Sequence, residues 1–229
     1  MSLSPTAVWV RAVETALRAQ ADAQQAVPMK AYMLGQFEFL GVRAGPRRDA
    51  LKGLMTLSGA ADELLARAEA LWRLPEREFR YVAVDLLAKH HKRLDVSALP
   101  RILQLVQTDA WWDTVDGLAG VVGDICLRAS AKPADAPQGL DECLVHPHLW
   151  VRRVAMLHQL GWREHTDEAR LFRYALSLAP ESDFFIRKAI GWALRDHARS
   201  RPDAVRAFLA QHRDRLSALT VREAGKHLG

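Results

Sequence analysis

WVRRVAMLHQLGW (residues 150–162) and FIRKAIGWALRDH (residues 185–197) follow one plan: a large residue, then polar groups, then small and aliphatic residues. EFRYVAVDLLAKH (residues 78–90) and WDTVDGLAGVVGD (residues 112–124) match it more loosely, and the four segments start 34, 38 and 35 positions apart. Apolar residues spaced three and four apart within them indicate amphipathic helices. Helix pairs that recur roughly every 35 to 45 residues are typical of HEAT-type repeats, which stack into curved α-solenoids.

The rest of the chain is consistent with an all-α fold. Residues 81–84 (YVAV) come nearest to a strand, but they lie inside a longer helical pattern. Several prolines stand near the start of helical segments, where the missing N–H does no harm. We therefore predict helix-pair repeats that form a curved α-solenoid, in one domain spanning residues 1–229.

Composition restricts the class of protein. Lys and Arg number 32 and Asp and Glu 27, so the net charge of +5 permits a polyanionic partner. The two cysteines are too few for a disulfide framework or a thiolate metal site, and we expect buried free thiols. No stretch approaches the roughly 18 apolar residues of a membrane span, and residues 1–20 lack the features of a secretory signal. A cytoplasmic protein without a membrane partner is expected.

The hexapeptide WWDTVD, residues 111–116, is the most unusual motif. On a helix, Trp112 and Asp116 are four positions apart and share a face, whereas Trp111 points elsewhere. An indole beside a carboxylate suits a cationic ligand, because the ring face attracts the cation and the carboxylate pairs with it. The same spacing also fits two core tryptophans, with Asp116 as a helix cap or the ion-pair partner of a neighbouring helix.

Cations recur at one place in the last two repeats. They are Arg152, Arg153, Arg187 and Lys188. Cations at one position of successive repeats would line one surface and form a track for phosphates. Others could extend this track: Arg47, Arg48, Arg77, Arg80, Arg195, Arg222 and Lys226. The alternative is a set of solvated faces, on which such cations pair with neighbours such as Glu78.

The remaining candidates are weaker. Trp192 and Tyr32 fit a core position or the lining of a cleft equally well. The nine histidines show no metal-ligand spacing, and there is no phosphate-binding glycine loop or nucleophile elbow. The sequence therefore gives no reason to expect a metal or an organic cofactor.

Several of these strings carry a resemblance to a known family. MKAYMLGQFEFLGV, LWRLPEREFRYVAVDLL, WWDTVD, WVRRVAMLHQL, FFIRKAIGWALRDHA and REAGKHL occur in order between Val27 and Leu228. Together they resemble the AlkD-type bacterial DNA alkylation repair glycosylases. The resemblance implies a concave HEAT-like solenoid that cradles duplex DNA. It also implies removal of N3- and N7-alkylated purines without a cofactor, with the lesion left in the base stack.

The resemblance assigns roles to five residues. The family's catalytic aspartate falls on Asp116, its essential cleft tryptophan on Trp112 and its cleft arginine on Arg153. Its other cleft aromatics fall on Trp192 and Tyr32. The chain departs from the pattern outside these positions: it has a short C-terminal tail, and a histidine at position 158 where an apolar or aromatic residue is expected.

The chemistry expected from this resemblance needs one carboxylate. Alkylation makes the purine a cationic leaving group, so Asp116 would stabilise the developing sugar cation and orient water, while Arg153 would hold a phosphate. A monomer is expected, because a curved solenoid needs its open face free for DNA. Two rivals remain: a solenoid that binds bent or damaged DNA without cutting it, and a scaffold for protein partners with tryptophan anchors.

Overall fold

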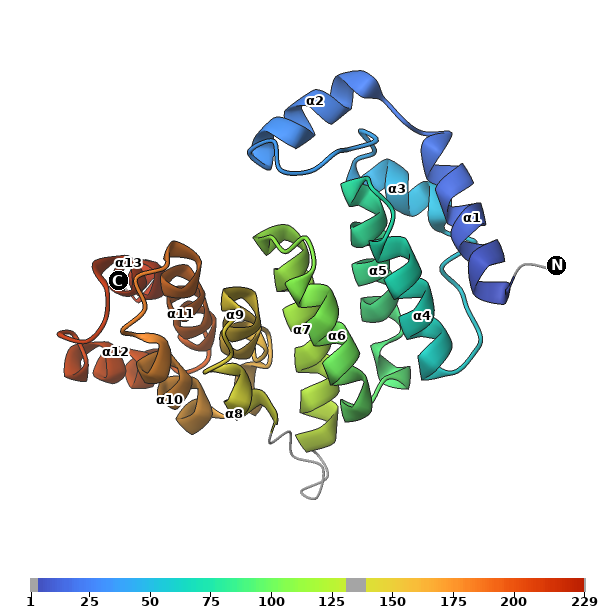
Figure 1. Ribbon diagram of the computed structural model, residues 1–229. Coiled ribbons are helices and arrows are strands. Elements are labelled where there is room, and N and C mark those ends of the chain that lie inside the picture. The colour runs from blue at the N-terminus through green and yellow to red at the C-terminus, as the bar shows by residue number, and fades with distance from the viewer. Residues whose placement is uncertain (1–3, 131–138, 229) are drawn as a thin grey trace. The chain divides into compact units, whose positions relative to one another are not determined.

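The computed structural model describes residues 4–130 and 139–228 (Figure 1). These residues fall into two compact units, one within residues 1–94 and the other within residues 95–229. The described ranges contain helices and no strand, so the predicted all-α fold is confirmed. The single domain expected from the sequence stays a prediction. Within the described ranges, no helix is both long and apolar enough to cross a lipid bilayer.

Residues 4–94 of the first unit form five α-helices and one short 3₁₀ helix. They are α1 (Pro5–Arg18), α2 (Ala23–Tyr32), α3 (Ala44–Leu51), α4 (Ala61–Trp72), α5 (Arg77–Lys89) and η1 (His91–Arg93). Helix α1 starts where Ser4 accepts a hydrogen bond from the amide of Ala7, with proline in the first turn. Its buried residues Trp9, Val13 and Leu17 are four positions apart and form one stripe, and α1 packs on α3 and α4.

A buried carboxylate holds the loop before α3 against α5. Glu78, in the first turn of α5, is fully buried and accepts hydrogen bonds from the amides of Leu40, Gly41 and Val42 at 3.0, 2.9 and 3.0 Å. Gly41 has a φ of +87°, and a Cβ there would lie 1.9 Å from the carbonyl oxygen of Asp22. The sequence had suggested Glu78 as a partner for surface cations. In the structure its carboxylate instead accepts hydrogen bonds from the backbone of this loop.

The second unit carries the remaining helices. They are η2 (Val96–Ala98), α6 (Leu99–Gln107), α7 (Trp112–Ser130), α8 (Gly139–Cys143), α9 (Leu149–Leu157), η4 (Arg163–His165), α10 (Glu168–Leu178), α11 (Phe184–His197), α12 (Pro202–Gln211), α13 (Ala218–Ala224) and η5 (Gly225–His227). Helices α6, α8 and α10 each pack on the α-helix that follows, and α7, α9, α11 and α13 lie side by side in a row (Figure 1).

The helix-pair arrangement explains the sequence repeat. The four related segments begin in α5, α7, α9 and α11, which are the second helices of successive pairs. Three of them stand next to one another in the row of the second unit. Residues at the same place in consecutive segments therefore come from neighbouring helices of one layer, and this is how residues far apart in sequence form one site.

His158, the unexpected histidine, belongs to the core of the second unit. It is buried just after α9, its ring lies 5.4 Å from Trp162 and 5.9 Å from Tyr174, and its Nδ1 contacts the carbonyl oxygen of Ala155 at 2.6 Å. Burial lowers the pKa of His158 from 6.5 to about 4, so the imidazole is neutral at physiological pH. It takes the place of the aromatic residue expected there.

Candidate functional site

The start of α7 presents the two residues that the motif singled out. Trp112 is the first residue of α7, and Asp116 follows one turn later on the same half-buried face. Thr114 and Val115, between them, are buried. Trp111, just before the helix, packs edge-on against Trp150 and Phe185 at centroid distances of 5.7 and 5.1 Å. Trp111 thus packs on two aromatic rings that also lie near the guanidinium of Arg153.

Asp116 is held by both of its carboxylate oxygens. Arg153, on α9, donates from Nε to Oδ1 and from Nη2 to Oδ2, each at 2.8 Å. The side chain of Arg153 is 1% exposed, whereas that of Asp116 is 25% exposed. A two-point ion pair with one partner buried fixes the carboxylate in position and orientation. The carboxylate is therefore anchored from the protein side and open to solvent on the other.

Aromatic rings and a carbonyl group surround the guanidinium of Arg153. Its third nitrogen donates to the carbonyl oxygen of Phe185, and its carbon lies 5.3 Å from the ring centroid of Trp192 and 6.0 Å from those of Trp150 and Phe185. These rings limit the access of water to the guanidinium, which strengthens its attraction to Asp116. We expected Arg153 to hold a phosphate, but in the structure the guanidinium is committed to Asp116.

Trp192 is oriented by a carboxylate on the last α-helix. Its indole Nε1 donates to Glu223 at 3.2 Å, and Glu223 also accepts from Arg195 at 3.2 Å and from Lys226 at 2.9 Å. Lys188 lies 3.4 Å from the same carboxylate and 5.1 Å from the Trp192 ring. Trp192 is half-buried. One of its edges is thus fixed by Glu223, while cations lie near its faces.

Glu223 is 4% exposed, and it is the centre of this network. Its pKa is lowered from 4.5 to about 2, first by the hydrogen bond from Lys226 and then by the nearby charge of Lys188. The approach of α13 to α11 depends on Gly191, because a Cβ there would lie 2.5 Å from the Cβ of Glu223. The glycine before Trp192 therefore leaves the space in which Glu223 reaches its donors.

Most cations of the predicted phosphate track are paired with other groups of the protein. Arg152 forms a two-point ion pair with Glu181 at 2.7 and 2.9 Å and also donates to the carbonyl oxygens of His146 and Pro147. Arg187 donates to the carbonyl oxygen of Glu181 at 2.9 Å. Arg153 and Lys188 are also paired, each with a carboxylate on a neighbouring helix, so all four cations of the two repeats have partners within the protein.

The cations and aromatics predicted in the first unit differ in exposure. Arg77 is fully buried, and its guanidinium lies 3.8 Å from the ring centroid of Phe37, while Arg80 is buried and donates to the backbone. Arg47 is 7% exposed and pairs with Asp85, whereas Arg48 is exposed. Tyr32 is 69% exposed at the end of α2. Of these residues, Arg48 and Tyr32 are open to a ligand.

Sequence reasoning missed the roles of Glu223 and Glu181. One signal for Glu223 was available: it lies between the buried residues Thr220 and Ala224 and is thus on the apolar face of α13. A carboxylate on such a face needs several donors. Glu181 lies just before α11 and carries no comparable pattern, because its partner Arg152 is 29 positions away.

The arrangement suits chemistry in which positive charge develops beside Asp116. The exposed side of the carboxylate can meet a cationic centre or a water molecule, and Trp112, one turn before it, offers an aromatic face. Among the described residues, no cluster of His, Cys, Asp and Glu could hold a metal ion. Both cysteines, Cys126 and Cys143, are buried.

Known proteins give matches over most of the chain. A solved structure described as a predicted DNA alkylation repair enzyme from Enterococcus faecalis is 30% identical, with 91% of this chain and 97% of that chain covered and a TM-score of 0.82. Two structures from Streptococcus mutans, AlkD2 and smu.31, are each 22% identical over 75% of this chain, cover 84% and 87% of their own and have TM-scores of 0.57 and 0.59. These last two support the fold alone.

The comparison of sequences leads to the family. A search of curated proteins gives no significant match. The sequence profile of the DNA alkylation repair enzymes matches residues 13–228, which include Trp112, Asp116, Arg153 and Trp192. The chain therefore belongs to the family of DNA alkylation repair enzymes.

Proposed function

We propose that this family member is a DNA glycosylase that releases cationic N3- and N7-alkylated purines from duplex DNA. The observation that carries the proposal is the pair of Asp116 and Arg153: a carboxylate fixed from behind by a buried guanidinium and 25% exposed on its other side. Trp112 and Trp192 are half-buried residues of the same unit. All of these groups lie in the second unit, and we propose that the protein acts as a monomer.

The proposed reaction is hydrolysis of the N-glycosidic bond. The bond between C1′ and the purine nitrogen breaks, its electron pair goes to the base, and the base leaves neutral. Positive charge builds on the deoxyribose, and the Asp116 carboxylate stabilises it electrostatically. A water molecule that Asp116 orients attacks C1′ and loses a proton, which leaves an abasic site. No second carboxylic acid is needed, because the alkylated base already carries the charge that protonation would supply.

The aromatic side chains take supporting roles in this proposal. Trp112 and Trp192 press on the sugar-phosphate backbone beside the lesion, and the face of an indole attracts a sugar cation. Glu223 keeps Trp192 in its orientation. Arg153 is a positioning residue: its two hydrogen bonds set the direction of the Asp116 oxygens and leave their exposed side for substrate or water.

The decisive experiment compares base release by wild type and Asp116→Asn. The substrate is duplex DNA that contains N7-methylguanine, and Asp124→Asn, an exposed position on the same helix, is the matched control. Asparagine keeps the shape but not the charge, so we expect release to fall by about 10²-fold or more. DNA binding should stay near the wild-type value, whereas thermal stability should fall, because the buried guanidinium of Arg153 loses its counter-charge. The control should release the base at the wild-type rate.

The other outcomes separate the rival functions. If neither wild type nor variant releases base while binding to duplex DNA weakens steeply with salt, the protein is a non-catalytic DNA-binding member of the family. Full activity of Asp116→Asn would assign the chemistry to another group. Weak DNA binding that does not respond to salt would instead favour the protein scaffold.

A further inference from the structure

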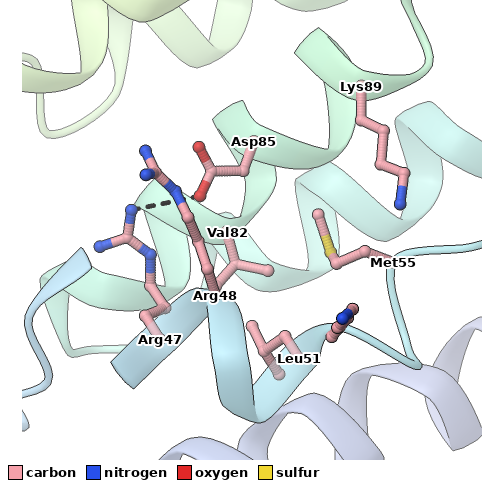
Figure 2. A pocket seen from close by; sticks show the side chains of 8 residues that line it. Arg47, Arg48, Leu51, Met55, Val82, Asp85 and Lys89 are labelled. Carbon is pink, nitrogen blue, oxygen red and sulfur yellow. Dashed lines mark hydrogen bonds and ion pairs between the residues drawn. The ribbon is translucent and has the colours of Figure 1, made fainter. Parts of the chain in front are cut away.

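A half-open pocket in the first unit gathers four cationic side chains. It has a volume of about 320 Å³ and lies between α3, the turn after it, and α5 (Figure 2). Arg47, Arg48, Lys52 and Lys89 line it, together with a single carboxylate, Asp85. Four cations and one carboxylate give the lining a formal charge of +3. Such a convergence of charge in one cavity attracts an anion.

Most of this positive charge is not neutralised within the protein. Arg47 pairs with Asp85 at 3.1 Å and lies over the Tyr81 ring. Among the residues that the structure describes, the side chains of Arg48 and Lys52 have no hydrogen-bond or ion-pair partner. Lys89 has only a long contact of 3.5 Å, to the hydroxyl of Thr56. The Arg47–Asp85 pair thus stiffens one wall, and the other three cations remain for a ligand.

Arg47 also has unused donor capacity. Its side chain is 9% exposed, and its Nε donates to no acceptor in the described part of the chain. A buried guanidinium nitrogen without an acceptor gives up hydration without replacing it, so an acceptor atom of a ligand would stabilise it. Figure 2 shows Arg47, Arg48 and Asp85 together at one side of the pocket, with Lys89 across from them. An anion between the two sides would meet cations from both directions.

The floor of the pocket is apolar. Leu51 and Val82 are buried and Met55 is half-buried, and all three line the same cavity (Figure 2). A bare inorganic ion would leave this floor uncovered. A phosphate joined to a sugar or nucleoside places charge against the cations and a less polar body against the floor. Guanidinium and ammonium groups together match the several oxygens of a phosphate better than the two of a carboxylate.

We propose that this pocket binds one phosphate group carried on a nucleotide. Cations that converge on a single cavity suit one phosphate, whereas a track for a strand needs cations spaced along a surface. The phosphate can come from a free nucleotide or from a strand of bound DNA. Only the second source rests on the proposed function. The pocket uses none of the residues around Asp116, so the two proposals can fail separately.

The first arm of the test uses thymidine 5′-monophosphate, whose phosphate carries about two negative charges at neutral pH. Binding is measured by calorimetry for wild type and for the variant R48Q/K52Q/K89Q, with unphosphorylated thymidine as the ligand control. The matched control variant is R11Q/R73Q/K92Q, which removes three exposed cations of the same unit that lie outside the pocket. We expect the pocket variant alone to lose affinity, by about tenfold or more, because its charge-assisted hydrogen bonds are gone.

The second arm measures binding to undamaged duplex DNA as a function of salt. Each phosphate contact contributes about 0.9 to the slope of log K against log salt concentration. One phosphate in the pocket predicts that the pocket variant loses about 0.9 of slope relative to the control variant. A loss in this arm identifies a DNA strand as the source, and a loss of nucleotide affinity in the first arm identifies a free nucleotide.

Two results would overturn the proposal. In the first, the pocket variant and the control variant behave alike in both arms, so that the pocket cations are ordinary surface charges. In the second, the slope falls by nearly three times the single-phosphate value, so that each cation meets a phosphate of its own on an open track. Base release from alkylated DNA, measured in parallel, keeps the result apart from the fate of Asp116.

Discussion

Glu223 shows how one buried carboxylate can organise the groups around an aromatic side chain. It accepts from Trp192, Arg195 and Lys226, and its pKa of about 2 keeps it ionised over the whole range in which the protein would work. An ionised acceptor fixes the indole more strongly than a neutral one would. The direction of the Trp192 ring is thus set by a residue 31 positions away.

We predict that Glu223→Gln slows base release by about tenfold, because loss of charge at a positioning group weakens its charge-assisted hydrogen bonds. Glutamine still offers one oxygen, but Lys188 and Arg195 lose their counter-charge, and the ring of Trp192 is free to turn. The measurement is single-turnover release of N7-methylguanine together with the emission maximum of tryptophan fluorescence. Glu142→Gln, on the exposed face of α8, is the control. If Glu223→Gln released the base at the wild-type rate, the charge of Glu223 would not be needed to position Trp192.

The proposed mechanism, in which one carboxylate acts on the substrate, also predicts which lesions are refused. Uracil is a neutral leaving group, and its departure needs help that Asp116 cannot give while it is ionised. We therefore expect release of uracil from duplex DNA to be at least about 10²-fold slower than that of N7-methylguanine, the span that acid catalysis commonly supplies. Parallel time courses with the two substrates measure this ratio. Comparable rates would contradict the proposed mechanism.

His158 makes the stability of the protein depend on pH. Its pKa is about 4 in the folded protein and 6.5 in an exposed histidine, because burial disfavours the charged ring. Below pH 6.5 the unfolded chain therefore binds a proton that the folded protein does not. The contribution of the neutral ring to stability is complete above pH 6.5 and is lost as the pH falls towards 4, where the loss reaches about 3 kcal/mol.

The substitution His158→Phe should remove this dependence. An aromatic ring of similar size can pack against Trp162 and Tyr174 without titrating. We expect the unfolding free energy of the wild type to fall, relative to that of the variant, by about 1.4 kcal/mol for each unit of pH on acidification from 6.5 to 4. Urea unfolding at several pH values measures both curves. Parallel curves would mean that the buried ring accepts a proton without cost.

Among the elements, the start of α5 is the most dependent on one side chain. Glu78 satisfies three consecutive amides of residues 40–42, and the Gly41 backbone comes too close to Asp22 to allow a side chain. These hydrogen bonds fix the loop that connects α2 to α3. The loop conformation and the α5 terminus therefore depend on each other.

We predict that Glu78→Ala destabilises the first unit strongly. Three buried amides lose their acceptor, and each buried donor left without one costs about 1 to 3 kcal/mol. The unfolding free energy should fall by about 3 kcal/mol or more. Chemical unfolding measures the change, and Asp49→Ala, an exposed position on α3, is the control. A variant as stable as the control would show that water replaces the carboxylate.

For the whole molecule, the repeat pattern was sufficient to predict the all-α fold and its helix pairs. Spacing within WWDTVD also placed Trp112 and Asp116 on one face of α7. The candidate roles of Arg153, Trp192 and Tyr32 came from the family resemblance, and they stay predictions. The phosphate track was overestimated, because the sequence does not show which carboxylates meet which cations: Arg152 pairs with Glu181 and Arg153 with Asp116, 29 and 37 positions away.

The row of α7, α9, α11 and α13 has one further consequence. Asp116, Arg153, Trp192 and Glu223 come from four different helices, and contacts between neighbouring helices link the Asp116 carboxylate to α13. No helix pair holds this network alone. A slight slip between neighbouring helices would separate its members while every helix stayed intact. We therefore expect base release to depend on how the helices pack. On heating, base release should be lost at a lower temperature than the helical circular dichroism signal.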